Sequence, residues 1–149
     1  MKARFVALLP LILVAGRAVA CSYIVQTQVS FESGSAALDR SQVIKLSEWL
    51  ERSYTTFPTY TSASVEVGAS GPAPLKAKAL AELRATNTVR ALRMLLRVDL
   101  PVVTVAQAYH SPKNSFGESN DFASLQLYPD VKDLKLPDCN PVPNPGVQR

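Results

Sequence analysis

Few residues of this sequence have the side chains and the spacing that catalysis or metal binding requires. The 149 residues contain one histidine, His110, and two cysteines, Cys21 and Cys139, far apart along the chain. Zinc and iron–sulfur sites usually need four such ligands in a spaced motif, so we expect no metal and no other cofactor. No serine lies in a nucleophile-elbow pattern, and neither cysteine has a base nearby in motif form. We therefore predict that the protein is not an enzyme, and we interpret His110 as a loop residue rather than a general base.

The first twenty residues have the pattern of a secretory signal peptide. Basic residues precede an apolar run, and Ala18 and Ala20 place small side chains where a signal peptidase recognises them. A membrane-spanning helix is the alternative, but Pro10 and Arg17 interrupt the run, which is shorter than the ~20 apolar residues that cross a bilayer. We predict that residues 1–20 are a signal peptide and that the mature protein is periplasmic.

Charge gives little support for a nucleic-acid partner. The whole chain has 16 basic and 12 acidic residues, and its net charge is +4 at pH 7. Cleavage after Ala20 removes three basic residues and no acidic ones, which leaves a mature net charge of about +1. Nucleic-acid binding depends on a large excess of positive charge, so we predict no nucleic-acid partner.

Two alternatives are open for the cysteines of an exported chain. Cys21 can become the lipidated first residue of a bacterial lipoprotein, which would anchor the protein at the outer membrane. Alternatively, Cys21 and Cys139 form a disulfide in the oxidising compartment. Ala18 suits ordinary cleavage at least as well as lipidation, and the first strand begins almost directly after Cys21, which leaves no tether. We favour the disulfide, which would stabilise the fold by about 4 to 5 kcal/mol in the chain-entropy model.

The elements that position these residues follow from hydrophobic periodicity. Alternation predicts strands over residues 23–31, 63–68, 102–109 and 123–127. Helical spacing predicts one helix from Asp39 or Ser41 to about Arg52, and a second from Leu75 to Arg97. Loops are expected over residues 54–60, 69–74 and 111–120.

This order of elements predicts an α/β fold, a two-layer βαβαββ sandwich with a mixed four-stranded sheet and two helices on one face. The last two strands can pair antiparallel across the loop that joins them. We place the folded domain at residues 21–130 and an extended or disordered Pro-rich tail at residues 131–149. The second helix has an uneven charge, with a single acid, Glu82, against six basic residues: Lys76, Lys78, Arg84, Arg90, Arg93 and Arg97.

Two segments resemble the OmpA-like peptidoglycan-binding domain of Gram-negative envelope proteins. VSFESGSAALD (Val29–Asp39) is similar to that family's first strand, which ends in an aromatic residue and is followed by a Ser/Gly turn and a leucine. LAELRATNTVRAL (Leu80–Leu92) is similar to its helix motif, with Arg84 and Ala85 at the positions of the Arg-Ala pair. The resemblance covers about Val25 to Leu127.

The resemblance implies non-covalent binding to the diaminopimelate peptide of peptidoglycan. In that family an Asp at a strand end and the Arg of the helix motif together hold the ammonium and carboxylate groups of diaminopimelate. Arg84 matches the Arg, whereas Ser70 and Gly71 stand at the positions of the family's Thr and Asp. The implied ligand contacts are Arg84, Ser70 and Gly71, and the motif lacks its acid unless Glu66 or Asp121 replaces it in space.

Two functions are therefore open. In the first, the protein is a non-catalytic envelope module that binds peptidoglycan through Arg84 and contacts the membrane only if Cys21 is lipidated. In the second, the same fold has lost this ligand, Arg84 belongs to a solvated basic helix face, and the protein binds other envelope or secretion proteins. A carboxylate placed near Arg84 in space would favour the first function.

Overall fold

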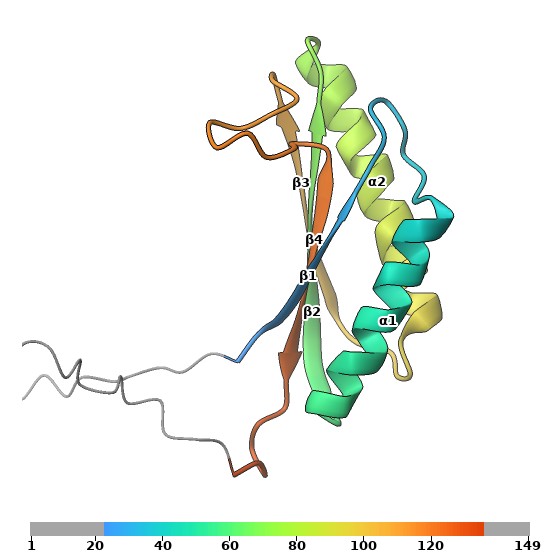
Figure 1. The fold of residues 1–149 in the computed structure, drawn as a ribbon, viewed down its shortest axis with the longest axis vertical. Coiled ribbons are helices and arrows are strands. Elements are labelled where there is room, and N and C mark those ends of the chain that lie inside the picture. The colour runs from blue at the N-terminus through green and yellow to red at the C-terminus, as the bar shows by residue number, and fades with distance from the viewer. Residues whose placement is uncertain (1–22, 136–149) are drawn as a thin grey trace, which may run out of the picture. The chain divides into compact units, whose positions relative to one another are not determined.

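Two helices cover one face of a four-stranded sheet in the computed structural model, which describes residues 23–135 (Figure 1). The predicted two-layer α/β architecture with a mixed sheet is confirmed. The predicted signal peptide, Cys21 and Cys139 lie outside the described residues. In chain order, the elements are β1 (Val25–Ser30), α1 (Arg40–Thr56), β2 (Tyr60–Ser70), α2 (Pro74–Leu95), β3 (Val102–Tyr109) and β4 (Phe122–Pro129).

The strand order is β1-β4-β2-β3, so the last strand of the chain lies inside the sheet. β4 is antiparallel to both neighbours, and its Leu125 pairs with Thr27 of β1 and with Val65 of β2. β2 and β3 are parallel and are joined by α2. The expected pairing of the last two strands is wrong, because β4 inserts between β1 and β2 and leaves β3 as an edge strand. A central position suits β4, whose Ala123, Leu125 and Leu127 have no exposed surface.

β2 is longer than its alternating pattern predicts. Ala69 is fully buried, and the backbone N–H of Gly71 donates to the carbonyl oxygen of Tyr109 at 2.9 Å. The ladder between β2 and β3 therefore continues to Ser70, within the segment predicted to be a loop. The extension places Ser70 at the end of a strand in the centre of the sheet.

α1 also extends beyond its predicted end. The hydroxyl groups of Thr55 and Thr56 donate to the carbonyl oxygens of Glu51 and Arg52, one helical turn earlier. These bonds accommodate β-branched residues that favour strand or loop in a sequence pattern. α1 therefore includes three residues of the predicted loop.

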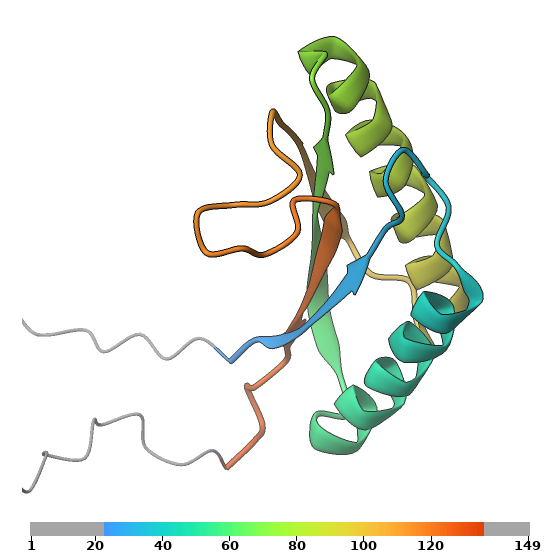
Figure 2. The same ribbon diagram turned by 45° about the horizontal axis from the view of Figure 1, so that its top comes forward.

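The core lies between the sheet and the two helices, which Figure 2 shows on the same side of the strands. α1 buries Leu46, Trp49 and Leu50 against it. α2 instead buries mainly small side chains, which leave room for the long side chain of Arg84 on the same face. Its buried residues are Ala77, Ala81, Arg84, Ala85, Thr88, Ala91 and Leu92. Neither helix of the described residues is long and apolar enough to cross a membrane.

Candidate functional site

Arg84 lies in the interior of the domain, and none of its surface is exposed. Its Nε donates to the carbonyl oxygen of Ser35 at 2.7 Å, and its Nη2 donates to that of Glu32 at 2.9 Å. Its Nη1 donates to the carbonyl oxygen of Gly68 at 2.9 Å and to Oδ1 of Asp121 at 2.5 Å. Four of the five N–H donors of the guanidinium are therefore bonded. The interpretation of Arg84 as part of a solvated basic face is wrong.

Three segments distant in sequence surround this guanidinium. The loop between β1 and α1 supplies the carbonyl oxygens of Glu32 and Ser35, and Phe31 places its ring centroid 4.7 Å from Cζ of Arg84. The centre of α2 supplies the side chain itself. The end of β2 and the start of β4 supply the remaining partners, so the site forms only when the sheet is complete.

Asp121 provides the carboxylate that the end of β2 lacks. It precedes β4 directly, and its side chain is 7% exposed. Its Oδ1 accepts from Arg84 Nη1 and, at 3.1 Å, from the backbone N–H of Ser70. Its Oδ2 accepts from the hydroxyl of Ser70 at 2.5 Å. The structure therefore brings the predicted residues Arg84 and Ser70 together through an acid.

The carboxyl group of Asp121 is held in its charged form. Burial disfavours the charge, but hydrogen bonds from the Ser70 hydroxyl, Arg84 and the Ser70 amide, together with the positive charge of Arg84, lower the pKa of Asp121 below its ordinary value. The site is therefore a closed ion pair at neutral pH.

The other acid considered for this role lies elsewhere. Glu66 is exposed on β2, and its Oε1 accepts from Nε2 of Gln107 on the neighbouring strand at 3.1 Å. The sequence names Asp121 as a candidate without placing it, because the contact between Ser70 and Asp121 spans 51 positions. Only the insertion of β4 beside β2 brings the two residues together.

Two glycines flank this end of β2 and differ in the space around them. A Cβ at Gly68 would collide with the carbonyl oxygen of Asn120 and would lie 2.8 Å from the ring of Phe122. A Cβ at Gly71 would meet only that of Ala77, at an ordinary contact distance of 3.7 Å. Gly68 is therefore required for the close approach of β2 to the segment that carries Asp121, a role that the sequence analysis missed. Gly71 has room for a Cβ.

Among the described residues, the other ion pairs join exposed side chains. His110 is exposed just after β3. Within residues 23–135, no group of three or more His, Cys, Asp or Glu side chains is placed to hold a metal ion.

Comparison with solved structures shows that the arrangement of strands and helices is that of OmpA-like domains. The chain is similar to the OmpA-like domain of FopA1 from Francisella tularensis subsp. tularensis SCHU S4, with a TM-score of 0.52 and 17% identity over 71% of this chain and 73% of that one. It is also similar to the peptidoglycan-associated lipoprotein from Burkholderia pseudomallei, with a TM-score of 0.46 and 15% identity over 68% of this chain and 88% of that one. No protein-family model and no curated protein matches the sequence. At 17% identity, the likeness to the FopA1 domain establishes the fold alone.

Proposed function

We propose that this chain is an exported, non-catalytic module of the bacterial cell envelope that binds the diaminopimelate peptide of peptidoglycan. The observation that carries the proposal is the pairing of Arg84 with Asp121, beside Ser70 at the end of β2. An acid and an arginine thus stand together where the resemblance implies the ligand site, although Gly71 replaces the expected Asp. The predicted signal peptide supports a periplasmic location, with an outer-membrane anchor only if Cys21 is lipidated.

The chemistry of the pair suits a ligand that has both charges on one carbon. Diaminopimelate presents an ammonium group, which Asp121 can hold, and a carboxylate, which Arg84 can hold through two parallel hydrogen bonds. In the ligand-free protein the two side chains satisfy each other. Binding exchanges this internal ion pair for two pairs with the ligand and requires the loop that contains Glu32 and Ser35 to uncover the guanidinium.

A specific observation favours a second candidate function. Arg84 has no exposed surface, and Asp121 already occupies its Nη1. In this second function the internal carboxylate replaces the ligand permanently, the Arg84–Asp121 pair is purely structural, and the protein acts through contacts with other envelope proteins.

Co-sedimentation with purified peptidoglycan separates the two candidates. The mature protein is mixed with diaminopimelate-type peptidoglycan, and with lysine-type peptidoglycan, which lacks the second carboxylate, at about 0.15 M salt, where exposed charges are screened beyond ~8 Å. The first function predicts that the protein pellets with the diaminopimelate type only. Absence from both pellets contradicts it and supports the second function.

Two variants test the roles of the acids. Asp121→Asn keeps the shape of the side chain but removes its charge, so we expect at least about tenfold weaker pelleting, with Glu66→Gln as the control. Gly71→Asp adds the carboxylate of the resembled motif at a position where a Cβ meets only an ordinary contact. If the wild type stays in solution and Gly71→Asp pellets, the fold retains the pocket but lacks a usable acid. Circular dichroism verifies that each variant is folded.

A further inference from the structure

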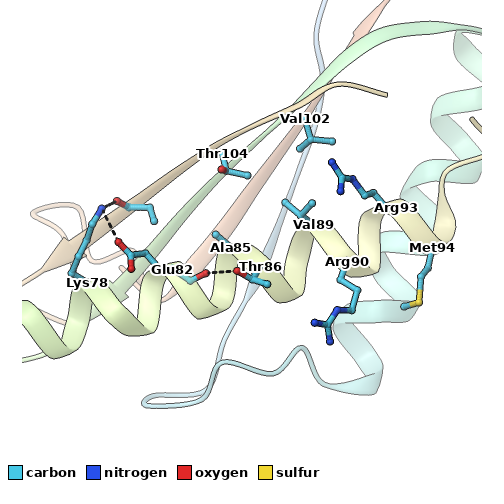
Figure 3. Close-up of a pocket in the computed structure, with 11 residues that line it drawn as sticks. Lys78, Glu82, Ala85, Thr86, Val89, Arg90, Arg93, Met94, Val102 and Thr104 are labelled. Atoms are coloured by element: carbon cyan, nitrogen blue, oxygen red, sulfur yellow. Dashed lines mark hydrogen bonds and ion pairs between the residues drawn. The ribbon is translucent and has the colours of Figure 1, made fainter. Parts of the chain in front are cut away.

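A groove of about 910 Å³ runs between α2 and β3, away from the Arg84–Asp121 pair. Ala85 and Val89 of α2 and Val102 of β3 supply apolar surface, while Arg90 and Arg93 line it with positive charge. Figure 3 shows Arg93 extending from α2 on the side of Val102, and Lys78 at the opposite end of the groove. The groove therefore combines apolar side chains with three basic residues and one acid, Glu82.

Within residues 23–135, β3 has no neighbouring strand on the side away from β2. Successive residues of a strand direct their N–H and C=O groups to opposite sides. Pro101 and Tyr109 direct their carbonyl oxygens to β2, where they accept from Ala63 and Gly71, so the odd-numbered residues between them face β2. The backbone groups of Val102, Thr104 and Ala106 consequently point to the free edge.

Lys78 covers one end of this edge and leaves the other end open. Nζ of Lys78 donates to the carbonyl oxygen of Ala106 at 2.5 Å and lies 3.9 Å from Glu82. A lysine at an exposed edge is a common protection against unwanted strand pairing. Within residues 23–135 no hydrogen bond of this kind covers Thr104, which is exposed.

The charge at the open end is uncompensated. Arg90 and Arg93 are exposed, and in the part of the chain that the structure describes neither forms an ion pair with an acid. An unpaired strand edge and an arginine without an ion pair, Arg93, therefore lie beside the apolar side chains of the groove. Strand addition to an exposed edge is an established mode of peptide recognition, in which alternate side chains enter adjacent pockets.

We propose that an extended acidic segment of a partner protein binds here as a fifth strand next to β3. Its backbone pairs with Val102 and Thr104, and the side chains that face α2 lie over Ala85 and Val89, with a carboxylate on Arg93. A second copy of this chain does not fit, because pairing two β3 edges would bring like charges together. Residues 136–149 include four prolines and a single acid, so they are poor strand donors.

The test uses a fluorescently labelled eight-residue peptide of alternating glutamate and valine, equal in length to β3. Binding to the mature protein is followed by fluorescence anisotropy at about 0.15 M salt. We expect saturable binding of this peptide and none of the matched lysine–valine peptide. Absence of binding at millimolar peptide, or equal binding of both peptides, overturns the proposal.

Variants separate strand addition from simple charge attraction. Thr104→Pro removes a donor that faces the free edge, where proline is tolerated, and should weaken binding at least about tenfold. Arg93→Glu should weaken binding by a similar factor. The control Lys45→Glu makes the same change of charge at an exposed position of α1 and should leave the affinity within about twofold of the wild type. An unchanged affinity of Thr104→Pro, or an equal loss with Lys45→Glu, contradicts the proposal.

Hydrogen exchange gives a second measurement that does not depend on a variant. In the wild type, the amide of Thr104 should exchange at least about tenfold more slowly when the glutamate–valine peptide is bound, because strand addition gives it an acceptor. Unchanged exchange of this amide under saturating peptide overturns strand addition even if Thr104→Pro fails to fold.

Discussion

Arg84 is an ionised side chain with no exposed surface, and such a group persists only where acceptors surround it. Three carbonyl oxygens and the carboxylate of Asp121 meet that requirement. The pair therefore has a structural role whether or not it also binds a ligand. It joins α2 to the end of β2, the start of β4 and the loop after β1.

Removing the carboxylate of Asp121 should destabilise the domain strongly. Asp121→Ala leaves the buried charge of Arg84 without its counter-ion, and we expect the free energy of unfolding to fall by about 3 to 5 kcal/mol. Urea denaturation measures the change. Glu66→Ala removes an exposed carboxylate from β2 and should stay within about 0.5 kcal/mol of the wild type. Equal effects of the two substitutions would show that the pair contributes nothing specific.

The lowered pKa of Asp121 predicts a loss of stability in acid. The group binds a proton more weakly in the folded than in the unfolded protein, so its contribution is present above its ordinary pKa of 3.8 and is lost as the pH falls through the lowered value. Asp39 also has a lowered pKa, chiefly because the Ser41 hydroxyl donates to it. Unfolding free energies measured from about pH 5 down to pH 2 should fall less steeply in Asp121→Asn than in the wild type. Identical slopes would contradict this assignment.

The two glycines at the end of β2 provide a test of close packing. Gly68→Ala forces a Cβ against the carbonyl oxygen of Asn120, a backbone atom that cannot move alone, and should cost more than about 2 kcal/mol of stability. Gly71→Ala meets only an ordinary contact and should change stability by less than about 0.5 kcal/mol. Thermal unfolding of both variants compares the two positions, and a neutral Gly68→Ala would refute the close approach.

At the scale of the elements, strongly periodic segments were predictable and their ends were less so. The helix from Pro74 to Leu95 and the strand from Val102 to Tyr109 follow their sequence patterns closely. The last turn of α1 and the end of β2 do not follow their sequence patterns. Their Thr-rich and Gly-containing segments are typical of loops, but hydrogen bonds within the helix and between the strands hold them in regular structure. A local sequence pattern does not predict hydrogen bonds to a strand that is distant in sequence.

Asp39 caps the N-terminus of α1. Oδ1 of Asp39 accepts from the backbone N–H of Gln42 at 2.9 Å, as an N-cap residue does. Asp39→Ala leaves this donor unpaired and should lower stability by about 0.5 to 2 kcal/mol, measured by chemical denaturation. Lys45→Ala, in the exposed part of the same helix, serves as the control. A loss no larger than that of the control would mean that the cap is not needed.

At the scale of the whole molecule, the layer architecture followed from the order of the elements, but the order of strands in the sheet did not. The pattern of β4 indicates a buried strand without indicating which strands it lies between. This missing step also explains why only half of the candidate site was predictable. Arg84 lies within a recognisable motif, whereas Asp121 reaches it only because β4 enters the sheet beside β2.

The proposed function requires the Arg84–Asp121 pair to open and receive diaminopimelate. The most direct measurement is an NMR titration of the mature protein with a soluble diaminopimelate-containing cell-wall peptide, observed at the Nε–H of Arg84 and the backbone amide of Ser70. We predict saturable shifts of both signals, because the ligand replaces Asp121 on the guanidinium and frees Ser70 from its carboxylate. Unchanged signals at saturating peptide, in a folded protein, would contradict the claim and leave the pair as a structural element alone.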